Sequence, residues 1–205
     1  WFFFDRARDL LATRALALVP GNHDTTGSGA TRSTASLRDY LGLPEPDGLT
    51  RALRWGPAGF LLLDSGVSSD FVMPGGAQYA WAAATLDAWA AAPPPWSFAA
   101  LHVPPYNVGA RHQSEQGLFR DLTGLFDGRL DWVFSGHEHL YQRLRPLRYN
   151  AELAPSGQYG RGPDDGVGYL VLPPAGALPT GGIISFEDEK AYYRDRLAYP
   201  VPGVE

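Results

Sequence analysis

The stretch that decides the fold is Asp131-Trp-Val-Phe-Ser-Gly-His-Glu-His139, a short apolar run followed by glycine and two histidines. Continuous apolar runs of about four to eight residues are typical of strands buried on both faces of a sheet. Residues 96–101, WSFAAL, repeat the pattern and lead into His102, and residues 15–19, ALALV, lead into GNHD at 21–24. In open α/β sheets, ligands bind beyond the carboxyl ends of the strands. The sequence therefore predicts an α/β fold with a histidine-rich site at one edge of a largely buried sheet.

The rest of the chain alternates between helix and strand patterns. The clearest helix is predicted over 78–92, where Tyr79, Ala82, Leu86 and Trp89 recur with helical spacing before the proline run that begins at Pro93. Further helices are predicted at 4–14, 36–43 and 115–126. Besides the three runs above, strands are predicted at 51–55, 60–64, 144–149 and 168–172.

Composition excludes several classes of protein. The 205 residues contain no repeat or interdomain linker, so we expect a single domain over residues 1–205. The net charge of −5 argues against nucleic acid as a partner bound on a broad basic surface. The absence of cysteine excludes disulfides, thiolate metal sites and cysteine nucleophiles. No apolar run reaches the roughly 18 residues of a membrane span, so none is predicted.

Histidine placement carries the chemistry. Four of the five histidines follow predicted strands: His23, His102, His137 and His139. Imidazole together with amide or carboxylate oxygen, without sulfur, suits Zn, Mn or Fe ions. The spacing at 137–139 is not the H-E-x-x-H of zinc proteases, which places two histidines one helical turn apart. Two loop histidines spaced in this way either face two different ions or flank one.

Three motifs in order, GNHD at 21–24, His102 in LHVPPY, and GHEHLYQR at 136–143, resemble the calcineurin-like metallophosphoesterases. Gln78 and Trp81 open the helix before LHVPPY, and this pattern resembles the purple-acid-phosphatase-like branch of the family. The resemblance implies an α/β/β/α sandwich with two metal ions of the Fe, Mn or Zn class. It also implies a phosphatase or phosphodiesterase that hydrolyses a small-molecule phosphoric ester with a metal-activated hydroxide. Members of this branch are often extracytoplasmic, although the sequence itself leaves localisation open.

Carried over residue by residue, the resemblance implies that Asn22, His102 and His137 are ligands of one metal ion. It implies that His139 is a ligand of the other ion. A plainer interpretation of Asn22 is a turn residue after glycine.

The same resemblance implies that His23 donates a proton to the leaving-group oxygen or stabilises transition-state charge, while Asp24 orients the site. Candidate substrate contacts are His112, Tyr141 and Arg143. Each of these has an alternative. Asp24 can form hydrogen bonds within its loop, and His112 can be a solvent-exposed loop residue. Tyr141 and Arg143 can stabilise the loops by packing against them.

The chain departs from the family in one respect. The motifs D-x-H and G-D-x-x-[DNY], which precede GNHD in the family, do not occur in it. They supply the carboxylate that bridges the two metals and most ligands of one ion. Because the chain also begins at Trp1, we expect it to be the C-terminal portion of such a domain, with an N-terminal segment missing. Alone, it should hold at most one ion weakly, turn over little or not at all, and leave a sheet edge or apolar face uncovered.

Two alternatives to a dinuclear hydrolase stay open at this point. The chain is either a degenerate domain that binds a partner or a metal without catalysis, or a mononuclear hydrolase that needs no bridging carboxylate.

Overall fold

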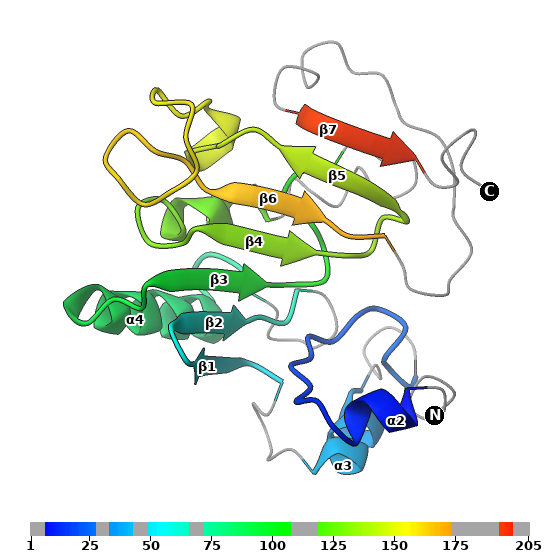
Figure 1. Cartoon of the computed structure of the whole chain (residues 1–205). Coiled ribbons are helices and arrows are strands. Elements are labelled where there is room, and N and C mark those ends of the chain that lie inside the picture. The colour runs from blue at the N-terminus through cyan, green and yellow to red at the C-terminus, as the bar shows by residue number, and fades with distance from the viewer. Residues whose placement is uncertain are drawn as a thin grey trace.

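The computed structural model describes residues 7–27, 33–42, 49–65, 72–107, 119–173 and 193–198. Its centre is a seven-stranded sheet in the order β1-β2-β3-β4-β6-β5-β7 (Figure 1). The strands are β1 (Arg51–Trp55), β2 (Ala58–Leu62), β3 (Trp96–Ala100), β4 (Trp132–Ser135), β5 (Leu140–Leu144), β6 (Gly168–Val171) and β7 (Tyr193–Ala198). Neighbours among β2, β3, β4 and β6 pair in parallel, whereas β1, β5 and β7 pair antiparallel. The predicted α/β class is confirmed.

The parallel strands end at the same edge of the sheet. The register places Leu62 beside Ala100, Ala100 beside Phe134, and Ser135 beside Val171. The loops that follow these strands therefore start at nearly the same level. The predicted strands at 96–101, 131–135 and 168–172 are confirmed to within about a residue, and this edge is where the histidine-bearing loops leave the sheet.

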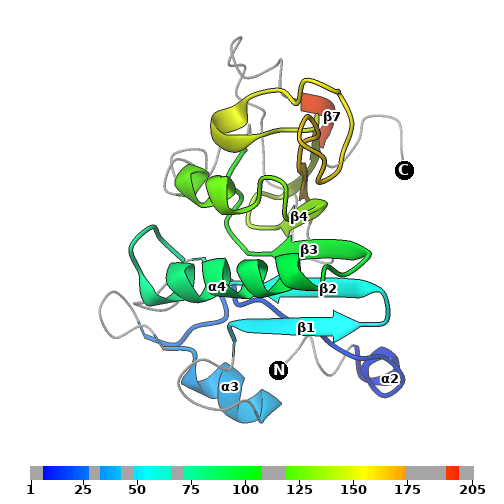
Figure 2. The ribbon, with the colours of Figure 1, turned by 90° about the vertical axis from the view of Figure 1, so that its left-hand side faces the viewer.

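One face of the sheet is covered by helix α4 (Ala77–Ala91), which confirms the helix predicted at 78–92 (Figure 2). Its buried Ala82 and Leu86 join sheet residues such as Leu61, Ala99 and Val133 in the main core. Burying this stripe is the main stabilisation of the helix, since apolar area removed from water contributes about 25 cal/mol per Å². At its start, the buried Gln78 accepts a hydrogen bond from Asp64 N at 2.7 Å and donates to Asp64 O at 3.2 Å.

The opposite face carries a row of aromatic side chains. Phe60 is level with Phe98 in the register, and their ring centroids are 5.2 Å apart. Phe134, which is level with Ala100, lies two residues further along, with its ring centroid 5.7 Å from that of Phe98, and all three side chains are half-buried. Trp55 and Trp96 share this face and are 66% and 54% exposed. Within the described residues, an apolar sheet face is therefore partly open to solvent.

Two strand predictions are wrong. Residues 15–19 are not a buried strand: most of this stretch is exposed, and no described strand pairs with it. An apolar run forms a strand only where neighbours satisfy its backbone groups. The strand expected at 144–149 is also displaced, because β5 already ends at Leu144. Pro146, which has no amide to donate, lies just beyond, and only Leu147 forms isolated bridges, to Leu153 and Val167.

The three other predicted helices, at 4–14, 36–43 and 115–126, are found near their predicted positions but are shorter in the described residues. Within 4–14 the structure has α2 (Arg8–Leu11), and in place of 36–43 it has α3 (Ala35–Leu41), which begins one residue earlier and ends two residues earlier. The helix expected at 115–126 is a 3-10 helix, η3 (Arg120–Leu125), in its described part. There the Thr123 hydroxyl donates to Arg120 O at 2.6 Å, a local bond that competes with α-helical geometry. A second 3-10 turn, η4 (Tyr149–Ala151), follows later.

Membrane-spanning helices are not found in the described part of the chain, where no helix combines the necessary length and apolarity.

Candidate metal centre

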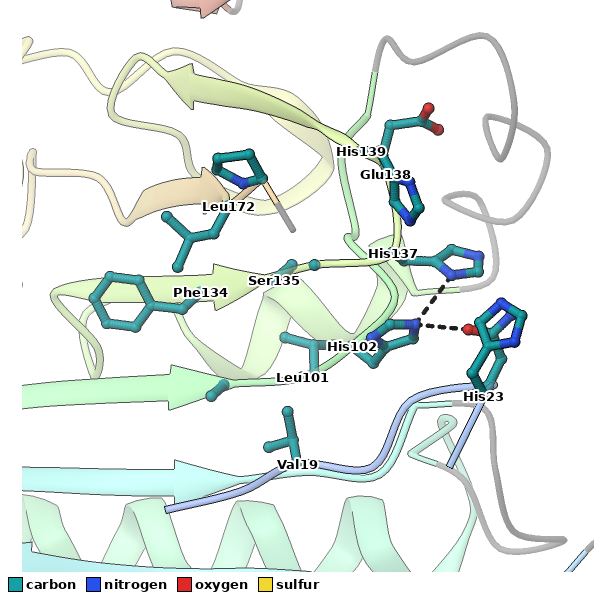
Figure 3. A pocket seen from close by; sticks show the side chains of 14 residues that line it. Val19, His23, Leu101, His102, Phe134, Ser135, His137, Glu138, His139 and Leu172 are labelled. Carbon is teal, nitrogen blue, oxygen red and sulfur yellow. Dashed lines mark hydrogen bonds between the residues drawn. The ribbon is translucent and has the colours of Figure 1, made fainter. Parts of the chain in front are cut away.

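Three side chains from distant segments meet at the carboxyl edge of the sheet. Asn22 comes from the turn after residues 15–19, His102 from the loop after β3, and His137 from the loop after β4. Asn22 Oδ1 lies 2.9 Å from His102 Nε2, and His137 Nδ1 lies 3.0 Å from the same nitrogen (Figure 3). Fold topology has therefore brought together residues that are 80 and 35 positions apart.

The spacing of these donor atoms fits one metal ion. Bonds from a divalent metal to nitrogen or oxygen are about 2.0–2.2 Å, so two ligands at right angles lie about 3.0 Å apart. Two imidazoles with an amide oxygen are a donor set that suits borderline ions such as Zn or Mn. Among the described residues, no group of three or more His, Cys, Asp or Glu could hold a metal ion, and the third donor atom of this cluster is an amide oxygen.

The position of His102 is fixed through its backbone and its ring. Gly136 N donates to His102 O at 3.0 Å, and Val103 N donates to Ser65 Oγ at 2.8 Å. Gly21 lies against the imidazole ring itself. Ser65, in the loop after β2, was not among the predicted site residues, because nothing in its local sequence points to the His102 loop.

His137 has an unusual backbone conformation. Its φ is +66°, in the left-handed region that non-glycine residues rarely adopt, and only 8% of it is exposed. Such conformations cost roughly 1–3 kcal/mol and cluster at functional sites. The turn aims the ring at His102, whose ring centroid is 4.8 Å away.

A cavity of about 580 Å³ opens beside the three donors. Its polar lining includes the half-buried His139 and the exposed His23 in addition to Asn22, His102 and His137 (Figure 3). The remainder of its wall is largely apolar and includes Val19, Leu101, Phe134 and Leu172. All four histidines predicted at strand ends therefore line one cavity.

Residues 3–141 match the family described as calcineurin-like phosphoesterase. The chain belongs to this calcineurin-like phosphoesterase family. The resemblance drawn from GNHD, His102 and GHEH is thereby confirmed.

Relatives of this phosphoesterase include plant proteins. Over 82 residues it is 38% identical to purple acid phosphatase 22 of Arabidopsis thaliana, covering 39% of this chain and 19% of that protein. Over 165 residues it is 28% identical to purple acid phosphatase 23 of the same plant, covering 77% and 35%. The chain thus spans about a third or less of the length of these relatives.

The fold is also shared with a solved structure. Purple acid phosphatase PPD1 from yellow lupin (Lupinus luteus) seeds matches with a TM-score of 0.67 at 16% identity, over 88% of this chain and 34% of that one. The mixed α/β fold of this phosphoesterase is therefore the purple acid phosphatase fold.

Asp24 has a hydrogen-bond partner three residues away in the chain. Its Oδ2 accepts a hydrogen bond from Gly21 N at 2.8 Å, while its own amide donates to Gly21 O at 3.0 Å. These bonds close the turn that presents Asn22. Asp24 is exposed and is not among the residues that line the cavity, so the structure favours its interpretation as a loop hydrogen-bonder.

The candidate substrate contacts lie away from the cavity or outside the described residues. The Arg143 guanidinium stacks 5.4 Å from the Trp132 ring centroid and 5.3 Å from that of Tyr159. Tyr141, two positions before it on β5, is half-buried and does not line the cavity. The geometry favours Arg143 as a brace, and His112 lies outside the described residues.

Three buried polar residues near the site escaped the sequence analysis: Asn107, Glu138 and Gln142. Gln142 offered the clearest clue, since it alternates with Tyr141 and Arg143 along a strand and therefore had to face the opposite side.

Proposed function

We propose that this chain supplies Asn22, His102 and His137 as ligands of a metal centre that hydrolyses phosphoric esters. The observation that carries the proposal is that Asn22 Oδ1 and His137 Nδ1 lie 2.9 and 3.0 Å from His102 Nε2. Membership of the calcineurin-like phosphoesterase family supports the reaction class. His139, which lines the same cavity, is proposed as a ligand of a second ion.

Metal ions of the Fe, Mn or Zn class, when bound, would neutralise phosphate oxygens and activate water. The side chains of this chain would hold and orient those ions. The half-buried His102 and the buried His137 provide the nitrogen donors, and the turn closed by Asp24 presents the amide oxygen of Asn22.

His23 is proposed to handle a proton. It is exposed, follows Asn22 in the chain and lines the same cavity as the proposed metal ligands (Figure 3). An imidazole in this place can protonate a departing alkoxide, since histidine changes charge near neutral pH. If it is the acid, its effect depends on how much the leaving group needs a proton.

A second candidate function is metal binding without turnover. It is favoured by the sequence, which contains neither D-x-H nor G-D-x-x-[DNY]. Without a carboxylate between them, two cations a few ångström apart repel each other strongly. In this alternative the chain binds at most one ion, and the site has a structural or partner-binding role.

Titration of the full chain with Zn²⁺ and Mn²⁺ by isothermal calorimetry tests the ligand set. His102→Ala and His137→Ala should each weaken binding by at least about tenfold. His112→Ala serves as the control, because it removes a histidine that the proposed ligand set does not include. Hydrolysis of 4-nitrophenyl phosphate and bis(4-nitrophenyl) phosphate is measured in parallel.

The outcomes separate the two functions. Metal binding that depends on His102 and His137, together with hydrolysis lost in the same variants, supports the hydrolase. Binding by the chain, with no hydrolysis at any length of the protein, supports the second candidate. Equal affinity in all three variants and the parent chain would contradict both.

A further inference from the structure

Behind the histidine loop lies a chain of three buried polar side chains. Asn107, Glu138 and Gln142 are 0%, 1% and 0% exposed. Gln142 Nε2 donates to Asn107 Oδ1 at 2.7 Å, and Asn107 Nδ2 donates to Glu138 Oε2 at 3.1 Å. Burying polar groups costs free energy unless they are hydrogen-bonded, so this arrangement is stable only as a connected set.

The set joins the segments that carry the metal-site histidines. Asn107 lies five residues beyond His102 in the loop after β3, and Glu138 lies between His137 and His139. Gln142 lies on β5, which the sheet holds on both sides. The Asn107 amide is thus the link between the His102 loop, the histidine turn and the sheet.

The turn that it contacts is tightly wound. Glu138 N donates to Gly136 O at 2.7 Å, which closes a three-residue turn around His137, whose φ is +66°. Leu140 N donates to Glu138 O at 2.9 Å and closes another around His139. A three-residue turn with positive φ at its centre is the rarer, strained form of the γ-turn. It persists only where the surroundings fix it, and Glu138, which closes this turn and begins the next, has its side chain held by Asn107.

We propose that Asn107 is a positioning residue of the metal site. By donating to the Glu138 carboxylate, it keeps the turn wound so that His137 and His139 line the cavity. By belonging to the His102 loop, it also sets His102 relative to His137. The inference rests on the proposed metal site for its effect on metal binding, while its effect on the histidine geometry is independent of any metal.

The test begins with Asn107→Asp in the full chain. This isosteric change replaces the donor toward Glu138 with an acceptor, while an oxygen remains for Gln142. Zn²⁺ affinity should fall about 10- to 100-fold, the usual effect of losing a partner that orients metal ligands. In the metal-free protein, the nuclear Overhauser contact between the His102 and His137 rings should weaken or disappear.

A compensating variant provides the rescue. In Asn107→Asp with Glu138→Gln, the new amide at 138 donates to the new carboxylate at 107, so the same link forms with its polarity reversed. The affinity for Zn²⁺ and the contact between the rings should return toward the parent values. Gln142→Glu gives a second disruption, because it requires the Asn107 amide to flip and present its oxygen to Glu138.

Asp131→Asn is the matched control. Asp131 accepts from Ser97 N at 2.7 Å in another buried polar cluster, at the opposite ends of β3 and β4. Its loss should lower the unfolding midpoint but leave Zn²⁺ affinity and the contact between the rings unchanged at temperatures where the chain is folded. A purely stabilising role for Asn107 would give this same pattern.

The readings distinguish the two proposals. Parent-like Zn²⁺ affinity and an intact ring contact in folded Asn107→Asp or Gln142→Glu overturn the inference. If both single variants fail to fold, rescue of folding, ring contact and Zn²⁺ affinity in the double variant supports it, and absence of rescue overturns it. A parent chain that binds no Zn²⁺, with the ring contact still lost in Asn107→Asp, contradicts the proposed function alone.

Discussion

Gly21 lies in van der Waals contact with His102: a Cβ added at Gly21 would lie 2.9 Å from Cε1 and 3.0 Å from Nδ1 of the imidazole. The glycine before Asn22 is therefore required by this close approach. The same glycine donates to Asp24, so one residue both closes the turn and makes room for a histidine 81 positions later in the chain.

Gly21→Ala should displace the His102 ring. We expect a loss of about 1–3 kcal/mol in the free energy of unfolding, as for overpacked sites, and at least about tenfold weaker Zn²⁺ binding. Gly136→Ala is the control, because its Cβ would lie 3.6 Å from the same ring, an ordinary contact. Urea unfolding and calorimetric titration of both variants provide the comparison, and equal Zn²⁺ affinities would contradict the steric argument.

The full chain should bind one metal ion or fewer. Three donors converge on one position, while His139 alone is assigned to the other ion. His139→Ala should therefore leave the affinity of the single ion unchanged, whereas His137→Ala should weaken it. Zn²⁺ should raise the unfolding midpoint of the parent chain by mass action, and a chelator should reverse the rise. Two tightly bound ions per chain, measured by elemental analysis, would refute this prediction.

His23→Asn should separate proton donation from metal binding. In whichever length of the protein turns over, metal content should stay the same while hydrolysis of an alkyl phosphate falls about 10²- to 10⁴-fold. The loss should be much smaller for a nitrophenyl ester, whose phenolate leaves without a proton. His137→Ala should instead reduce metal content and both rates together. If His23→Asn strips the metal or slows both esters equally, His23 is a ligand or an electrostatic stabiliser.

The partly exposed aromatic face should make this chain self-associate. Phe98 lies at the centre of that face, and exposed apolar patches of this kind favour association. Sedimentation velocity should show a mass that rises with concentration, and Phe98→Lys should reduce the rise. Asp87→Lys, a charge change on α4 across the sheet, is the control and should have little effect. A chain that stays monomeric at every concentration would show that the face is covered.

Asp127 should give the unfolding free energy a measurable pH dependence. Burial raises the pKa of Asp127, and the hydrogen bond from Tyr149 N opposes this only in part. Between its ordinary and raised pKa values the folded chain binds more protons than the unfolded chain, so stability falls as pH rises through that window. Asp127→Asn should reduce the pH dependence of the free energy of unfolding, measured with urea from pH 4 to 7. If the free energy of unfolding depends on pH in the same way in Asp127→Asn as in the parent chain, the burial of Asp127 has no effect on stability.

The sequence by itself determined the family, the sheet core and the four histidines that line the cavity. The apolar runs that end at His102 and His137 are visible because a strand buried on both faces has a local pattern, and GNHD and GHEH are contiguous motifs. For the same reason helix α4 was predicted to within a residue, since its periodicity needs no knowledge of the rest of the chain.

Only the tertiary structure decided the remaining features. Residues 15–19 have the composition of a strand but pair with no described strand, and pairing depends on distant neighbours. Arg143 follows a functional motif yet stacks on Trp132 and Tyr159, because β5 runs antiparallel to β6 and carries Arg143 back from the carboxyl edge. The link from Gln142 through Asn107 to Glu138 joins residues up to 35 positions apart, and a hydrogen bond of that range leaves no pattern in the local sequence.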